Sequence, residues 1–200
     1  MLFRSAERRP LALRNTAFAR GFADSIGLFA PDPGLESAGP DGAALRAKAG
    51  EYLERHARAE FNIPGITFGS RYDGSPIISH DRQAAPPDRA DAYEPSGVPG
   101  GRAPHMWLPD GRSLFDLFGF EFTLLDLGDK PNLTGLQSAF GKLAGLVRAL
   151  APDQPGLRAL YGARFVLVRP DQMIAWRGER LPDRPAQLLV RAAQIQPGFG

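Results

Sequence analysis

Apolar residues in the first part of the chain recur with the spacing of a helix. Between Glu7 and Ala30 they stand four, four and three residues apart, at Phe18, Phe22, Ile26 and Phe29. This spacing puts them on one face of a helix, which should stop at Pro31–Gly34, because proline lacks the backbone donor that a helix needs. A second helix is predicted from Asp41, a capping residue type, to about Glu60. The chain therefore begins with two amphipathic helices.

After the second helix the pattern becomes extended and then irregular. Two short strands are predicted at Ile66–Tyr72 and Ser75–Ile78, on either side of an Asp73-Gly74 turn. From His80 to Pro99, prolines and charged residues replace apolar ones, which indicates a linker. We expect a domain boundary within residues 81–99.

The rest of the chain predicts a small mixed sheet with helices. Strands are expected at Met106–Leu108, Glu121–Leu127, Arg164–Arg169 and Met173–Arg177. Helical segments are expected at Ser113–Phe118, about Gly135–Leu150 and about Arg184–Ile195. A β-α-β segment followed by a β-hairpin and a last helix is the order of a thioredoxin-like α/β domain, in which helices cover both faces of the sheet.

Composition narrows the functions that are open to the chain. Basic and acidic residues number 24 and 22 and alternate along the chain, so we predict no nucleic-acid partner. The absence of cysteine excludes disulfides, thiolate metal sites and thiol redox chemistry. No apolar run is long enough to span a bilayer, and the N-terminal residues lack the pattern of a secretion signal. We expect a cytoplasmic protein with no membrane partner.

Several segments resemble one enzyme family. The runs Gly101–Leu108, Asp110–Ser113 and Asp116–Gly119 are similar to the C-terminal region of FAD-dependent aromatic-ring hydroxylases. These are the single-component flavoprotein monooxygenases that include phenol, hydroxyphenylpropionate and polyketide hydroxylases. Glu7–Pro10 resembles the helix that follows their flavin-binding core, and Val168–Asp171 with Ala175–Arg177 resembles their last β-hairpin. The matches follow the family's order along nearly the whole chain.

The resemblance implies a division of the chain and a set of partners. Residues 1–80 would supply C-terminal helices and short strands of an incomplete FAD-binding domain, residues 81–99 a linker, and residues 100–200 the thioredoxin-like domain. The whole enzyme would use FAD, NAD(P)H and O2 to hydroxylate a phenolic or polyketide ring. The partners would be the missing N-terminal FAD and substrate domains, or a second polypeptide that carries them, and a homo-oligomer is compatible with this arrangement.

The chain itself carries little of that chemistry. It contains no GxGxxG segment, which holds the pyrophosphate of a dinucleotide at a helix N-terminus. The redox thiols of a thioredoxin would stand between Leu127 and Thr134, where there is no sulfur. His80 and Asp81 are adjacent, but no further metal ligand stands at a useful spacing. We therefore predict no catalytic residue, no cofactor-binding residue and no metal site in this chain.

Three residues are candidates for a contact between domains: Arg102, His105 and Trp107. Arginine offers a fork of donors to carbonyls or a carboxylate, and tryptophan buries its ring while its N–H finds a partner. His105 with Asp110 or Asp116 is an alternative, a catalytic dyad, which we consider the weaker interpretation.

Two functions follow from these observations. The first is the C-terminal part of a FAD-dependent aromatic monooxygenase, with a structural or oligomerising role and no activity when alone. The alternative is a standalone, non-enzymatic thioredoxin-like module that binds a partner through the apolar face containing Phe18 and Phe22. Because such a face is expected to pack against a flavin domain in the enzyme, it would form an exposed patch without one.

Overall fold

The structure is a computed structural model that describes residues 2–195, with side chains described from Ser5 onward. It divides into two compact units. The sheet unit contains the described residues of Met1–Arg8, Ser70–Pro87 and Glu94–Gly200, and the helical unit contains Arg9–Gly69 and Asp88–Tyr93. Residues of the predicted linker thus belong to both units.

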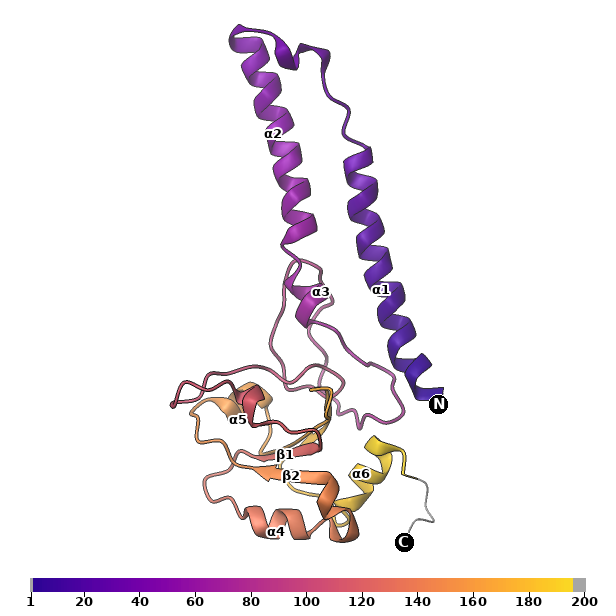
Figure 1. Cartoon of the computed structure of the whole chain (residues 1–200), viewed down its shortest axis with the longest axis vertical. Coiled ribbons are helices and arrows are strands. Elements are labelled where there is room, and N and C mark those ends of the chain that lie inside the picture. The colour runs from indigo at the N-terminus through magenta and orange to yellow at the C-terminus, as the bar shows by residue number, and fades with distance from the viewer. Residues whose placement is uncertain (1, 196–200) are drawn as a thin grey trace. The chain divides into compact units, whose positions relative to one another are not determined.

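The helical unit is built on two long antiparallel helices (Figure 1). Helix α1 spans Leu2–Gly27 and helix α2 spans Gly39–Phe61, with the short 3-10 helix η1 (Pro33–Glu36) between them. The two predicted helices are confirmed. The start of α2 differs from its prediction, because Pro40 occupies the first turn and Asp41 follows it inside that turn.

The chain contacts α2 at the end of α1 and just after it. Phe29, which follows α1, lies against Tyr52 with ring centroids 5.3 Å apart, and the hydroxyl of Ser25 lies 2.6 Å from Nδ1 of His56. Phe18 and Phe22 are half-buried, whereas Ile26 is 45% exposed. The stripe therefore has a partner inside this unit, but the two helices do not fully cover it.

The prediction of two strands before the linker is wrong. Residues Pro64–Phe68 form the short helix α3, and residues 75–78 form turns. Pro64 begins α3 instead of only ending α2, because the first turn of a helix tolerates its missing N–H. Arg71 contributes only an isolated bridge to Gly101.

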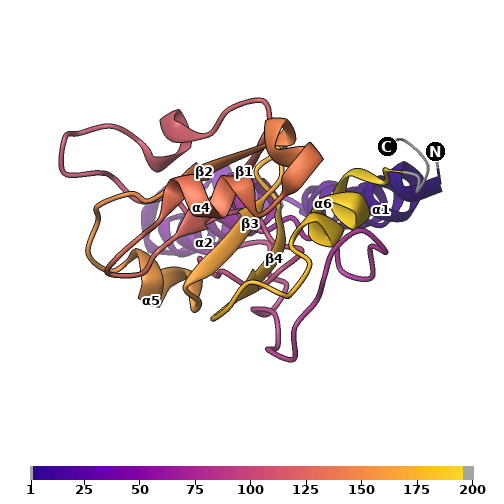
Figure 2. The same cartoon turned by 90° about the horizontal axis from the view of Figure 1, so that it is seen from below.

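The sheet unit contains a four-stranded mixed sheet in the order β2-β1-β3-β4 (Figure 2). Its strands are β1 (Phe122–Asp126), β2 (Val147–Leu150), β3 (Phe165–Val168) and β4 (Ile174–Gly178). Strands β1 and β2 are parallel, and the β1–β3 and β3–β4 pairs are antiparallel. The predicted hairpin of the last two strands is confirmed.

Helices cover both faces of this sheet, as expected from the sequence. One core contains Leu124 and Leu167 together with residues of α4 (Leu133–Ser138) and α6 (Ala186–Ala193). The other contains Leu125 and Val166, the alternate positions of the same strands, with residues of α5 (Leu157–Tyr161) and of η2 (Leu114–Leu117). Figure 1 shows α4 and α5 on opposite sides of the sheet.

Two further predictions in this unit are wrong. The helix expected at 135–150 is divided into α4, the 3-10 helix η3 (Gly141–Leu146) and strand β2, and Gly141 has a φ of 56° at the first break. The strand expected at Met106–Leu108 is reduced to a single bridge between Trp107 and Ser113. Helix α5 was not predicted.

Among the described residues, no helix is both long enough and apolar enough to cross a membrane.

Candidate functional site

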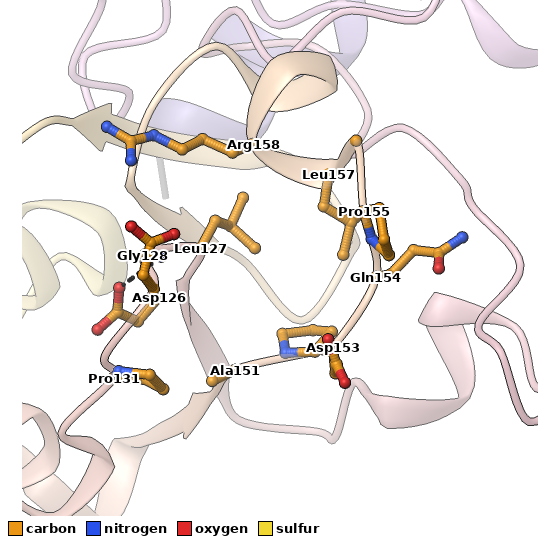
Figure 3. Close-up of a pocket in the computed structure, with 13 residues that line it drawn as sticks. Asp126, Leu127, Gly128, Pro131, Ala151, Asp153, Gln154, Pro155, Leu157 and Arg158 are labelled. Atoms are coloured by element: carbon orange, nitrogen blue, oxygen red, sulfur yellow. Dashed lines mark hydrogen bonds between the residues drawn. The ribbon is translucent and has the colours of Figure 1, made fainter.

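A hollow of about 470 Å³ lies at one edge of the sheet (Figure 3). Because β1 and β2 are parallel, their carboxyl ends meet at this edge. The hollow lies between the segment Asp126–Pro131, which follows β1, and residues 151–158, which follow β2. The hollow therefore lies beyond the carboxyl ends of two parallel strands, the edge at which open α/β sheets bind ligands.

The most buried charge in the hollow is already paired. Asp126 is 2% exposed and accepts hydrogen bonds from Nε of Arg164 at 3.0 Å and from the backbone N–H of Gly128 at 3.0 Å, the latter drawn in Figure 3. The hydrogen bond to Asp126 raises the pKa of the Arg164 guanidinium above its ordinary value, although desolvation acts in the opposite direction. Asp126 is therefore held as the structural partner of Arg164 and is not available as a general base.

The other groups that line the hollow suit binding better than catalysis. They are the carboxylates of Asp129 and Asp153, the amide of Gln154 and the guanidinium of Arg158. Gln154 donates from Nε2 to the carbonyl of Trp107 at 2.7 Å. The lining residues include no hydroxyl, thiol or imidazole that could act as a nucleophile or as its base.

The structure brings Arg102, His105 and Trp107 together: the first two lie against the ring of Phe115, and Trp107 lies against His105. The guanidinium of Arg102 lies 5.1 Å from the centroid of this ring, and the imidazole of His105 lies 5.2 Å from it. His105 also packs edge to face against Trp107, with centroids 4.9 Å apart. Trp107 remains 64% exposed. The three residues form one cluster, and their role as a contact between domains stays a prediction.

The alternative dyads of His105 are not formed. Its Nε2 lies 2.9 Å from the hydroxyl of Ser113. Asp110 accepts instead from Arg112, whose hydrogen bond lowers the pKa of that carboxyl below its ordinary value, and Asp116 accepts from the backbone N–H of Ser113. Ser113 and Asp116 form a capping box at the start of η2, a spacing that can be recognised in the sequence and was missed.

Asp81 pairs with an arginine of the sheet unit. Its Oδ2 accepts from Nε of Arg177 at 2.7 Å, and Arg177 also donates to the carbonyl of Tyr161 at 2.7 Å. Within residues 2–195, no group of three or more histidine, aspartate or glutamate residues could hold a metal ion.

The chain thus contains a small mixed α/β domain, whose sheet has helices on both faces, and a pair of long helices. Residues 96–195 match the family described as the C-terminal region of aromatic-ring hydroxylases. The chain belongs to this family.

Longer enzymes resemble the chain over three quarters or more of its length. The FAD-dependent monooxygenase opdD of Penicillium oxalicum is 30% identical over 94% of this chain and 38% of its own length. The phenol 2-monooxygenase of a Pseudomonas species is 28% identical over 75% of this chain and 28% of its own. The structure of the rebeccamycin biosynthetic enzyme RebC with reduced flavin has a TM-score of 0.80 and 36% identity, over 94% of this chain and 35% of the RebC chain. The chain thus spans between 28% and 38% of the length of these relatives.

Proposed function

We propose that this chain acts as the C-terminal part of a FAD-dependent monooxygenase that hydroxylates a phenolic or polyketide ring. In the whole enzyme, O2 and NAD(P)H would convert a ring C–H into C–OH, with one oxygen atom leaving as water and NAD(P)+ as the second product. The observation that carries the proposal is the match of 94% of the chain to RebC with reduced flavin at a TM-score of 0.80. A match that includes both units supports a common role more strongly than a match to one domain.

The flavin site belongs, in this proposal, to a part of the enzyme outside this chain. A dinucleotide needs free backbone N–H groups at a glycine-rich turn between a strand and a helix. The turn after β1 contains one glycine, Gly128, and its N–H is already bonded to Asp126. A Cβ on Gly128 would lie 2.6 Å from Nε of Arg164, so this glycine makes room for an arginine of the same chain. The residues present here do not fit a flavin.

The sheet unit is proposed to be a thioredoxin-like domain without redox function. Its order β2-β1-β3-β4, with β1 and β2 parallel and a hairpin at the end, supports this assignment. A thioredoxin places its thiols after the first of these strands, where this chain has Leu127–Thr134 and no cysteine. The domain would stabilise the enzyme or an oligomer of it in the cytoplasm.

The helical unit is proposed to complete the flavin domain. The buried residues of Arg9–Gly69 are two glycines, Gly42 and Gly65, and several apolar residues of the unit are more than a third exposed: Leu13, Ile26, Leu28, Leu53, Phe61 and Phe68. Two helices alone bury too little apolar surface for a stable core. Exposed apolar groups of this kind favour a larger partner domain, and Arg102, His105 and Trp107 would provide a further contact with it. No observation favours the standalone module over this role.

A flavin titration tests where the cofactor binds. The purified chain is mixed with FAD, and the visible flavin bands are followed after removal of free FAD. We expect the protein to stay colourless, whereas stoichiometric retention of FAD would overturn the assignment of the flavin site to another part.

A chimaera tests the function itself. This chain replaces the matching C-terminal region of RebC, and the product is assayed for bound FAD and for oxidation of NAD(P)H that depends on an aromatic substrate. We expect both. A folded chimaera that binds no flavin would contradict the proposed role, and unmodified RebC is the control.

A further inference from the structure

A second hollow, of about 490 Å³, adjoins the first at the same edge of the sheet unit and is rich in positive charge. Four of the residues that line it are basic, Lys130, Arg158, Arg164 and Arg180, and two are acidic, Asp129 and Glu179. The basic residues come from the segment after β1, from α5, from the segment before β3 and from the segment after β4. Folding thus gathers charges that are scattered along the sequence.

Two of these four cations are already held in place. Nε of Arg164 lies 3.0 Å from Oδ1 of Asp126, and Asp126 does not line this second hollow. NH2 of Arg158 lies 2.8 Å from Oε2 of Glu179. Such pairs orient the guanidinium groups, and each planar fork still has N–H donors that are not used by its carboxylate.

The other two cations have no carboxylate partner within residues 2–195. Lys130 and Arg180 are both exposed, and neither forms an ion pair there. Among the described residues Asp129, the other acidic group of the lining, also forms no ion pair, although its negative charge acts on Arg164. The hollow therefore keeps an excess of positive charge after the internal pairs are counted.

We propose that this hollow is an oxyanion site that binds the phosphate group of a small molecule. Guanidinium groups bind phosphate through two parallel hydrogen bonds, and an ammonium group adds a point charge. The position agrees with the rule that open α/β sheets bind ligands beyond the carboxyl ends of their strands. The site lies in the sheet unit and does not depend on the proposed flavin chemistry.

The test is a titration of the ¹⁵N-labelled full chain with inorganic phosphate, at about pH 8 so that the phosphate is doubly charged. Amide shifts should saturate and should be confined to residues near Gly128–Lys130, Arg158 and Arg180. Sodium chloride at the same ionic strength should not reproduce them, because it only screens charge. Amide shifts that do not saturate with phosphate, or that sodium chloride reproduces, would contradict the proposed site.

Variants then identify the groups that bind. Lys130→Gln combined with Arg180→Gln should weaken phosphate binding by about tenfold or more, because the two cations without a carboxylate partner are lost. Both side chains are exposed and unpaired, so the fold should be retained. Lys142→Gln combined with Arg148→Gln, at two exposed residues outside the hollow, removes the same amount of charge and is the matched control, which should bind as the parent does. Equal losses in the first double variant and the control would show a general charge effect and reject the proposal.

Discussion

Glu7, near the start of α1, accepts a hydrogen bond of 2.7 Å from Arg169, which lies 162 residues further along the chain at the end of β3. Glu7 is 4% exposed, and its Oε1 also accepts from the hydroxyl of Ser75 at 2.7 Å. Arg169 in turn contacts Asp171 and lies over the ring of Tyr72. The first turns of α1 are thereby held to the hairpin of the sheet unit by a buried charged network.

Removing Glu7 should destabilise the sheet unit. Glu7→Ala leaves a buried guanidinium with only Asp171, and we expect a loss of about 3 kcal/mol in the free energy of unfolding. Urea denaturation followed by tryptophan fluorescence measures it, because Trp107 and Trp176 both belong to this unit. Adding Arg169→Met to Glu7→Ala should recover part of the loss, since no buried charge then remains unpaired.

The control for Glu7 is an exposed carboxylate of the same unit. Oε2 of Glu179 lies 2.8 Å from NH2 of Arg158, and both side chains are more than half exposed. Glu179→Ala should cost about 0.5 kcal/mol or less. If Glu7→Ala were no more costly than Glu179→Ala, the buried network would contribute nothing to stability.

The same network predicts how stability changes in alkaline solution. Burial, followed by the negative charges of Asp171 and Glu7, raises the pKa of the Tyr72 hydroxyl above its ordinary value of about 10. The folded state therefore keeps this proton at a pH where the unfolded state loses it. The stabilisation is fully present below the ordinary pKa and is lost as the pH rises through the raised pKa.

Tyr72→Phe tests this pH dependence. The variant cannot ionise at this position, so its free energy of unfolding should fall less steeply above about pH 10 than that of the parent. The difference between the two proteins should be independent of pH near neutrality, which serves as the internal control. Parallel curves throughout the alkaline range would show that the Tyr72 proton is not linked to folding.

Local patterns were sufficient to predict part of the fold. Strands β1, β3 and β4 are short apolar runs bounded by turn residues, and each was predicted from that pattern. Strand β2 was missed because Val147–Leu150 follows a run of helix-forming residues. It is extended because it pairs with β1, and pairing between distant segments cannot be recognised in a local window.

The candidate site shows the same limit. Ser113 and Asp116 have the spacing of a capping box, so their positions could have been predicted. Neither the Glu7–Arg169 pair nor the gathering of Lys130 with Arg180 has any local signal. The pair forms because the start of α1 lies against the β3–β4 hairpin, and Lys130 meets Arg180 because the sheet topology brings the ends of separate strands to a common edge.

Gly97 should be sensitive to the smallest side chain. A Cβ at this position would lie 2.0 Å from the backbone carbonyl oxygen of Tyr161, a residue that is fully buried. Gly97→Ala must displace backbone, and we expect a loss of about 3 kcal/mol in urea denaturation.

Gly145→Ala is the matched control for Gly97. A Cβ at Gly145 meets no atom within 4 Å, and its φ is not positive. This substitution should be neutral or slightly stabilising, because it restricts the unfolded chain. Similar effects of the two substitutions would contradict the close approach at Gly97.

Trp107 should matter more for association than for folding. Its side chain is 64% exposed, so Trp107→Ala should change the free energy of unfolding of the chain by about 1 kcal/mol or less. If its ring is buried against the flavin-bearing part, the same substitution should weaken that association by about 2 kcal/mol, as for a tryptophan at the centre of an interface. Calorimetric titration of the chain with RebC from which the matching region is deleted measures this effect.

Leu28→Ala, at a 78% exposed residue of the loop after α1, removes a different apolar group and tests the helical unit in the same assay. Equal binding by the parent and by Trp107→Ala would exclude the cluster of Arg102, His105 and Trp107 as a contact between domains.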